Sequence, residues 1–203
     1  MIGILDFGIG NHFSILKIFQ KLKIEAELVA DPCAIPNFKK LILPGVGNIA
    51  SCMEALNKSG LLPPTQEAVF NKQIPILGIC VGMQMLSDFS EEGETLGLGW
   101  INGRVRRFPN KINSQSLRVP HVGWNNVEGR GPLFQSIEAN TSFYFTHSYY
   151  FDCVDSDNIA ATTNYGLSFA SAVQKGHIYG VQFHPEKSHA GGVQLLKNFA
   201  ENC

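Results

Sequence analysis

The 203-residue sequence has almost no net charge, no paired cysteines and no long hydrophobic run. Its formal net charge is -1, so it lacks the basic excess that would favour nucleic acid or an acidic membrane surface as a partner. No apolar run approaches the ~20 residues of a membrane-spanning helix. The apolar N-terminus lacks the basic start of a signal peptide and is interrupted by Asp6. We therefore expect an ordinary soluble globular protein with no nucleic-acid or membrane partner.

The cysteines are few, odd in number and widely scattered, and none forms a C-x-x-C pair. This usage is not typical of a disulfide framework or of a zinc site. We expect a reduced, cytoplasmic setting, and we expect no metal and no cofactor. The five are Cys33, Cys52, Cys80, Cys153 and Cys203.

The pattern of apolar residues changes between the two halves of the chain. In the first half, strands are expected at residues 2–5, 25–29, 40–43 and 74–79, and helices at 11–22, 49–56, 65–71 and 81–89. Strands that alternate with helices predict a mostly parallel sheet. In the second half, β-rich runs at 103–108, 141–146, 159–163, 169–175 and 178–183 predict an antiparallel extension, followed by one helix at 192–200. We expect a single α/β domain.

The segment Gly78-Ile79-Cys80-Val81-Gly82 lies where an expected strand meets an expected helix. A nucleophile elbow needs this context, because small neighbours permit the strained turn and the helix N-terminus favours a thiolate. The same short pattern is equally compatible with a buried structural cysteine. A catalytic cysteine also needs a base, which must come from elsewhere in the chain.

Among the six histidines, His184 in GVQFHPEKS is the strongest candidate for that base. Pro185 favours an extended conformation at His184, and Glu186, two residues on, would then project from the same side. A carboxylate there can orient the imidazole. Alone, a surface turn is the simpler interpretation; beside Cys80, the pair favours a Cys-His-Glu triad. Of the others, we expect His12, His177 and His189 to face solvent, and His121 and His147 to pack or to line a substrate site.

Two further segments could contribute to a site. Pro44-Gly45-Val46-Gly47 follows a strand, at the sheet edge where α/β folds bind ligands. Its backbone N–H groups could form an oxyanion hole together with the N–H of Val81, although an ordinary turn has the same composition. The aromatic run at residues 144–150 could be hairpin core with a polar end that meets a small substrate.

Together, DFGIGN, LPGVG, GICVGMQML, PHVGWNNV, HSYY and GVQFHPEKS resemble the class I (triad) glutamine amidotransferases. LPGVG and PHVGWN narrow the resemblance to the glutaminase subunits of imidazole glycerol phosphate synthases, which act in histidine biosynthesis. The resemblance covers essentially the whole chain. It implies a three-layer, flavodoxin-like α/β fold with a mostly parallel sheet and an antiparallel extension, and a single type 1 glutamine amidotransferase domain over residues 1–203.

The resemblance also implies a role for each candidate residue. Cys80 would attack the side-chain amide of glutamine, His184 would take the thiol proton and protonate the departing ammonia, and Glu186 would orient His184. Water would then hydrolyse the glutamyl thioester. Glutamine would be held by Gln84, Glu92, Ser148 and Tyr149, and the oxyanion by the N–H of Val81 with that of Val46 or Gly47, after a local peptide rearrangement.

The resemblance further implies a partner, a (β/α)₈-barrel cyclase that receives the ammonia within a heterodimer. Asn11, Trp124 and Lys187 match positions near that interface. One alternative is a paralogous glutaminase that supplies ammonia for the amidination of a surface-glycan sugar. Two others are a catalytically silent subunit, which the three filled triad positions argue against, and a thiol hydrolase for another amide. Low basal activity is expected without the partner, because an oxyanion hole that must rearrange is a gate.

Overall fold

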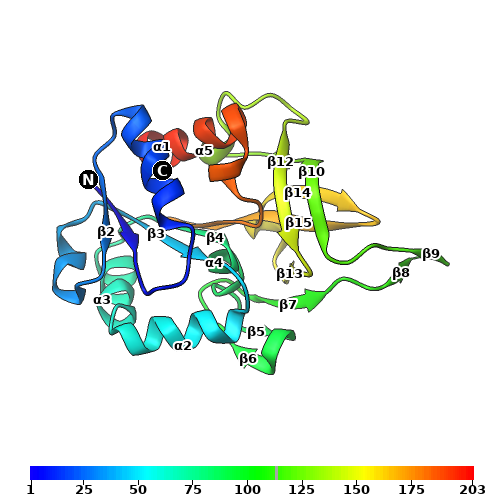
Figure 1. Cartoon of the computed structure of the whole chain (residues 1–203), viewed down its shortest axis with the longest axis horizontal. Helices are drawn as coiled ribbons and strands as arrows, with labels where there is room; N and C mark the ends of the chain where they lie inside the picture. Colours follow the sequence, from blue (N-terminus) through cyan, green and yellow to red (C-terminus); the bar gives the residue numbers. More distant parts are fainter. Residues whose placement is uncertain (113) are drawn as a thin grey trace.

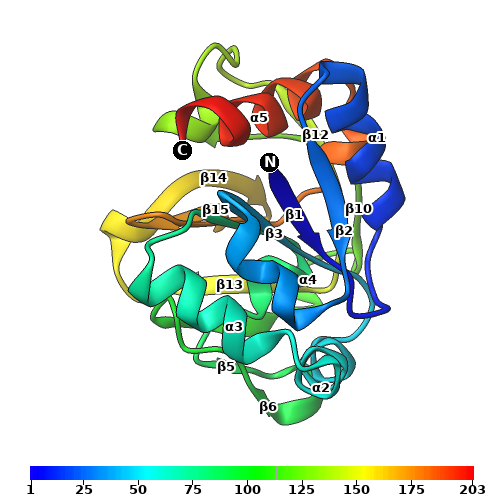
Figure 2. The same cartoon turned by 90° about the vertical axis from the view of Figure 1, so that its left-hand side faces the viewer.

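The computed structural model describes residues 1–112 and 114–203. Its centre is a 12-stranded mixed sheet. Helices α1 and α5 lie over one face of this sheet, and α2 and α3 lie over the other (Figures 1 and 2). The expected three-layer α/β fold is therefore confirmed. The helices are α1 (His12–Leu22), α2 (Ile49–Ser59), α3 (Leu62–Gln66), α4 (Val81–Gln84) and α5 (His189–Asn202).

Five neighbouring strands form the parallel part of the sheet, in the order β2-β1-β3-β4-β16. Because helices cover both faces, β1, β4 and β16 are buried at every residue, as their continuous apolar runs predict. The strands are β1 (Ile2–Leu5), β2 (Ala26–Val29), β3 (Lys40–Gly45), β4 (Ile76–Cys80) and β16 (Ile178–Val181).

The sheet continues from β16 into the predicted antiparallel extension. β16 pairs parallel with β4 and antiparallel with β15, so it joins the two parts. The path runs on through β13, β7, β5 and β6, while β14 pairs with β15 off this path and β11 pairs with β14. Their bounds are β5 (Phe89–Ser90), β6 (Thr95–Leu96), β7 (Gly103–Arg107), β11 (Glu128–Gly129), β13 (Tyr149–Cys153), β14 (Ile159–Tyr165) and β15 (Leu167–Lys175).

A separate antiparallel pair, β10 (His121–Asn126) and β12 (Ser142–His147), lies next to the main sheet (Figure 1). A second small pair is β8 (Lys111–Ile112) with β9 (Gln115–Ser116). α3 continues into a π-helical turn over Glu67–Asn71. Short 3₁₀ turns cover Pro32–Asn37, Glu92–Glu94, Pro132–Phe134, Ser156–Asn158 and Pro185–Lys187.

The helices begin and end where local chemistry favours it. The side chain of Asn48 caps α2 by accepting from the N–H groups of Ala50 and Ser51. Gly60 ends the same helix with φ 74°, in the left-handed region that glycine adopts at low cost. α1 buries Ile15 and Phe19 on its inner face, so its amphipathic pattern anchors it on the sheet.

One expected helix is much shorter than its pattern predicts. Residues 81–89 form only the single turn of α4, and Phe89 already belongs to β5. The carbonyls of Met85 and Leu86 would continue the helix, but they accept hydrogen bonds from the N–H groups of Leu98 and Trp100. These tertiary contacts compete with the helix and end it.

Across the described residues, no helix combines the length and hydropathy needed to span a membrane.

Candidate active site

Cys80 occupies a sharp turn between β4 and α4. Its φ of 55° and ψ of -111° lie in a region that residues other than glycine rarely adopt. Such a conformation is costly and persists only where the surrounding structure enforces it. Here a Cβ on Gly82 would overlap the carbonyl of Leu43 on β3, and one on Gly78 would lie 2.6 Å from the carbonyl oxygen of Gly82. Close packing of the turn therefore requires the two flanking glycines.

His184 faces this turn from the end of the strand-like segment after β16. Its backbone is extended, as Pro185 predicts, and its N–H donates to the carbonyl of Tyr144 on β12. Nδ1 of His184 lies 2.8 Å from Oε1 of Glu186, and both side chains are buried. The contact arises differently from the expectation, because Glu186 sits in a 3₁₀ turn and not in an extended segment.

The electrostatics of this pair favour a charged histidine. Burial alone would lower the pKa of His184, but hydrogen bonds and charge attraction from Cys80 and Glu186 outweigh it and raise that pKa. Burial likewise opposes the ionised form of Glu186, yet its hydrogen bond to His184 keeps the pKa of the carboxyl below its usual value. An ionised carboxylate only accepts, so Nδ1 donates to it and Nε2 is left to exchange a proton with Cys80.

Asn11 belongs to the same cluster. Its amide nitrogen donates to Oε1 of Glu186 at 3.0 Å, so the residue expected at a partner interface also holds the carboxylate. The second oxygen of Glu186, Oε2, is buried without a partner among the described residues. One carboxylate oxygen therefore receives both donors and is fixed by them.

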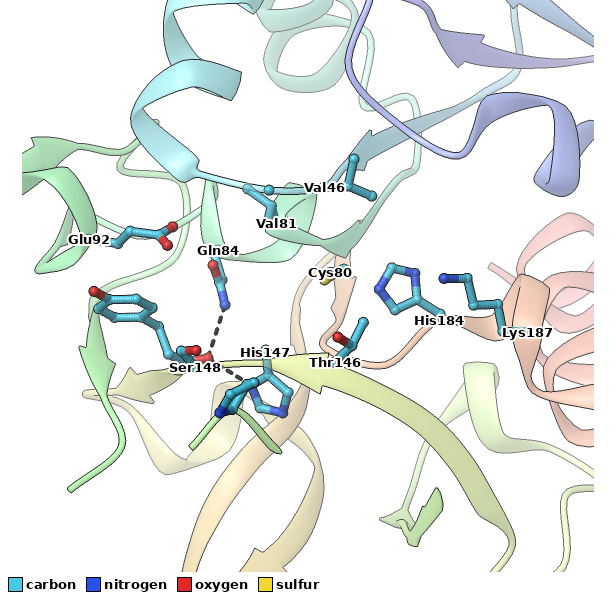
Figure 3. A pocket seen from close by; sticks show the side chains of 13 residues that line it. Val46, Cys80, Val81, Gln84, Glu92, Thr146, His147, Ser148, His184 and Lys187 are labelled. Atoms are coloured by element: carbon cyan, nitrogen blue, oxygen red, sulfur yellow. Dashed lines mark hydrogen bonds between the residues drawn. The ribbon is translucent and has the colours of Figure 1, made fainter. Parts of the chain in front are cut away.

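A pocket of about 380 Å³ opens above Cys80 and His184 (Figure 3). It is large enough for a small polar ligand. Every residue expected to hold glutamine or its oxyanion lies on its wall. The lining comprises Val46, Gly47, Cys80, Val81, Gln84, Glu92, Pro120, Thr146, His147, Ser148, Tyr149, His184 and Lys187.

Two of these wall residues are held in place by backbone groups. The amide nitrogen of Gln84 donates to the carbonyl of Tyr149 at 3.0 Å. Oε2 of Glu92 accepts from the N–H of Ile49 at 2.9 Å, at the first turn of α2, where a helix attracts negative charge. These hydrogen bonds hold the side chains of Gln84 and Glu92 in place before any ligand arrives.

The loop after β3 carries the backbone groups expected to stabilise an oxyanion. Gly47 has φ 79°, which glycine adopts readily. The carbonyl of Val46 accepts from the thiol of Cys52 at 3.3 Å. Because C=O and N–H of one trans peptide point in opposite directions, this contact also sets the direction of the Gly47 N–H.

The remaining residues expected at a partner interface lie together on one rim of the site. The Lys187 ammonium is 5.6 Å from the ring centroid of Tyr144. Trp124 packs edge-to-face on the same tyrosine, stacks on His189 and leaves 48% of its surface exposed. Trp124 and Lys187 thus both contact Tyr144, and Lys187 also lines the pocket.

The sequence did not identify every residue of the site. Gln182 is fully buried and its amide nitrogen lies 3.8 Å from the Cys80 sulfur. Two-residue periodicity from His184 could have found it, because alternate residues of a strand share a face. The alternative of a substrate-lining role holds for His147, which lines the pocket and also bonds to His121. Pro120 and Thr146 also line the pocket; their segments were singled out in the sequence, but neither residue was named for the site.

The expectation that three histidines face solvent is correct only for His189. His12 is buried beside Phe7, with Nε2 3.7 Å from a carboxylate oxygen of Asp6, and burial lowers its pKa. His177 is half-buried, and its Nε2 pairs with the carbonyl of Val69. The loop before α1 covers the ring of His12, and the π-helical turn after α3 covers that of His177.

Comparison with known proteins agrees with this geometry. The family model "Glutamine amidotransferase class-I" matches residues 3–203. Imidazole glycerol phosphate synthase subunit HisH of Leptospira borgpetersenii is 45% identical over 202 residues, which cover 98% of this chain and 99% of that protein. The subunit of the same name from Bdellovibrio bacteriovorus is 44% identical over 203 residues, with 99% and 100% covered.

Solved structures show the same fold at lower identity. A crystal structure of glutamine amidotransferase superposes with a TM-score of 0.75 at 20% identity, covering 98% of this chain and 97% of that one. The structure of PurLQS from Thermotoga maritima gives a TM-score of 0.71 at 15% identity, with 98% and 96% covered. The chain belongs to the class-I glutamine amidotransferase family, and within it to the HisH subunits of imidazole glycerol phosphate synthase.

Proposed function

We propose that this chain is the glutaminase subunit of an imidazole glycerol phosphate synthase, acts in histidine biosynthesis, and hydrolyses glutamine at Cys80. The observation that carries the proposal is the strained turn of Cys80 beside the buried His184–Glu186 pair, at the base of a pocket. Because its pKa is raised, His184 readily takes the proton of the neighbouring thiol, which leaves a thiolate beside a charged histidine. Metal ions are not needed for any step that we assign below.

The reaction follows from the positions of these groups. The Cys80 thiol passes its proton to His184, and the sulfur attacks the side-chain carbonyl carbon of glutamine. The resulting oxyanion accepts from the N–H of Val81 and, after a local peptide rearrangement, from that of Val46 or Gly47; one such donor contributes about 3–4 kcal/mol in the transition state. His184 then protonates the nitrogen, and ammonia leaves as the C–N bond breaks.

A glutamyl thioester remains on Cys80. His184 takes a proton from water, the hydroxide attacks the thioester, and the sulfur leaves as thiolate with release of glutamate. Glu186 orients His184 throughout. Gln84 and Glu92 offer oxygens to the substrate's ammonium group, and Ser148 and Tyr149 line the wall beside them.

A (β/α)₈-barrel cyclase subunit is the partner that we assign to this chain, as a heterodimer in which ammonia passes from this pocket to the second active site. Support comes from the shared rim of Trp124 and Lys187 next to the pocket and from Asn11 against Glu186. A partner that binds there would touch the groups that hold the histidine. The relatives compared are named as synthase subunits, so we do not favour the surface-glycan alternative.

Two further assignments accompany this function. Residues 1–203 form one glutamine amidotransferase domain, which the continuous sheet from β2 to β6 supports. The compartment is the cytoplasm, because a nucleophilic thiol must stay reduced to react.

The test is glutamate release by the purified chain alone, with the histidine-pathway cyclase, and with the cyclase plus its ribonucleotide substrate. Strong stimulation in the third condition is expected. Cys80→Ala should abolish release while partner binding persists, and Cys33→Ala, at an exposed cysteine, should leave release unchanged. Normal turnover by Cys80→Ala would overturn the nucleophile assignment. If only a glycan-pathway cyclase stimulated glutamate release, the chain would be assigned to that pathway.

A further inference from the structure

Gln182 lies between two groups of the site and bonds to both. It follows β16, and its backbone N–H donates to the carbonyl of Ser171 on β15, which fixes its place. Its amide nitrogen donates to the sulfur of Cys80 at 3.8 Å. Its amide oxygen accepts from the amide nitrogen of Gln84 at 3.0 Å. The side chain is fully buried, so water cannot replace either contact.

The orientation of both amides follows from one backbone carbonyl. The oxygen of Tyr149 can only accept, so Gln84 must direct its nitrogen toward it. The other N–H of the same nitrogen then meets Gln182, which must present its oxygen there and its nitrogen to Cys80. Both donors of Gln84 are used, and its Oε1 is left to accept from a ligand in the pocket.

A pair of neutral histidines fixes that carbonyl from its other side. Nδ1 of His147 lies 2.7 Å from the oxygen of Tyr149, so this nitrogen carries the proton. Nε2 of His147 therefore accepts from Nδ1 of His121 at 3.0 Å. Nε2 of His121 in turn accepts from the amide of Asn125 at 3.3 Å. A directed chain of hydrogen bonds thus leads to the carbonyl on which Gln84 and Gln182 depend.

We propose that Gln182 is a positioning residue for the glutaminase reaction, which holds the Cys80 sulfur and the Gln84 amide in a fixed relation. This inference rests on the proposed function. The N–H donated to sulfur stabilises thiolate over thiol, because a donor favours the charged form of its acceptor. The oxygen that accepts from Gln84 keeps Oε1 of Gln84 aimed into the pocket. One side chain thereby serves both the nucleophile and the bound glutamine.

The decisive variant is Gln182→Met, which keeps the length of the side chain and removes both contacts. In the complex with the cyclase, the KM for glutamine should rise on the order of tenfold, since a lost hydrogen bond that leaves a buried group unpaired costs about that factor. In the isolated chain, the rate of Cys80 alkylation by iodoacetamide should reach its midpoint at higher pH, as followed peptide by peptide in a mass spectrometer.

The matched control is Gln194→Met. Gln194 is half-buried on α5, where its amide bonds to Asn198, outside the pocket lining. This change should leave both the KM and the alkylation profile as in the wild type. If folded Gln182→Met also leaves both unchanged, Gln182 only fills space and the proposal is overturned.

A second measurement needs no change at Gln182, so it decides the question even if Gln182→Met does not fold. In NMR spectra of the wild-type chain labelled with ¹⁵N-glutamine, one side-chain amide resonance should change its chemical shift with pH. The midpoint of that change should coincide with the midpoint of the Cys80 alkylation profile. That shift should vanish in Cys80→Ala. If no glutamine amide follows that midpoint, the contact with sulfur is refuted. Neither this measurement nor alkylation uses glutamine turnover, so failure of the proposed function would show separately as absent glutamate release.

Discussion

Two buried pairs reach the pocket, His184 with Glu186 and His147 with His121, and they differ in charge: the first is an ion pair and the second is neutral. On one side, Cys80 and Glu186 raise the pKa of His184 against the effect of burial. On the other side, burial lowers the pKa of His121 to about 4 and that of His147 to about 3. All three histidines are buried, so burial alone does not decide which one is charged. The presence of an anionic partner decides it.

The contrast assigns different tasks to the two sides. A histidine that holds a proton beside a thiolate can transfer that proton to a leaving group. A pair of neutral histidines has no such proton to transfer. Each ring has one donor and one acceptor, so the pair can transmit a fixed orientation from Asn125 to Tyr149. One side of the pocket therefore suits proton transfer, and the other suits the positioning of the substrate.

The largest expected effect comes from removal of the anion beside His184. Glu186→Gln keeps the size of the side chain but loses its charge, so the pKa of His184 should fall toward that of the neutral pair. Glutamate release in the cyclase complex should fall by about 100-fold or more; the same type of change in a serine protease triad costs about 10⁴-fold. Histidine ring NMR and a glutamate assay would measure the two effects.

The control for this change is Glu201→Gln, at an exposed residue of α5 that pairs only with Lys197 among the described residues. It should alter neither the titration of His184 nor the rate. If Glu186→Gln kept the wild-type rate, the contrast between the two sides of the pocket would have no catalytic meaning.

The neutral pair should dominate the pH dependence of stability on the acid side. The two rings have lower pKa values in the folded chain than the 6.5 of an unfolded histidine. Between pH 6.5 and about 4 the unfolded chain therefore binds more protons, and the free energy of unfolding falls as pH falls. Each ring contributes about 1.4 kcal/mol per pH unit in this window. Denaturant unfolding at several pH values would measure the slope.

His121→Phe tests the source of that slope. His121 stacks on Phe145 and Tyr165, so a phenyl ring can occupy its place. The variant should be less stable at pH 7, because His147 loses its donor, but its stability should fall less steeply below pH 6.5. An unchanged slope would show that other groups, such as the surface carboxylates, cause the acid sensitivity.

Much of this arrangement could be predicted from local sequence. The glycines around Cys80, the extended residue before Pro185 and the loop after β3 all carry their geometry in neighbouring residues, and the structure places them around one pocket. The early end of α4 could not be predicted, because the N–H groups of Leu98 and Trp100 compete for its carbonyls. Contacts such as that of Gln84 with Tyr149 join positions 65 residues apart. No local pattern encodes them.

The smallest expected effect concerns Cys52, the second buried thiol. Like the histidine pair, it is kept neutral by burial. Burial raises the pKa of Cys52 to about 11, so this thiol stays protonated at neutral pH and can donate to the carbonyl of Val46. That contact restrains the Val46–Gly47 peptide, one of the two peptides whose N–H could turn toward the oxyanion in the proposed reaction. Cys52→Ala should therefore raise glutamate release by the isolated chain about threefold to tenfold, the worth of one neutral hydrogen bond.

Cys52→Ser separates this restraint from simple packing, because a hydroxyl still donates to the carbonyl of Val46. Its basal rate should stay near that of the wild type, and with the cyclase and its substrate present all three chains should approach a common rate. Equal basal rates for Cys52→Ala and the wild type would mean that the loop is restrained elsewhere. A lower rate for Cys52→Ala would mean that the hydrogen bond holds the loop in its active form, and that the gate lies in the partner's contacts near Lys187 and Trp124.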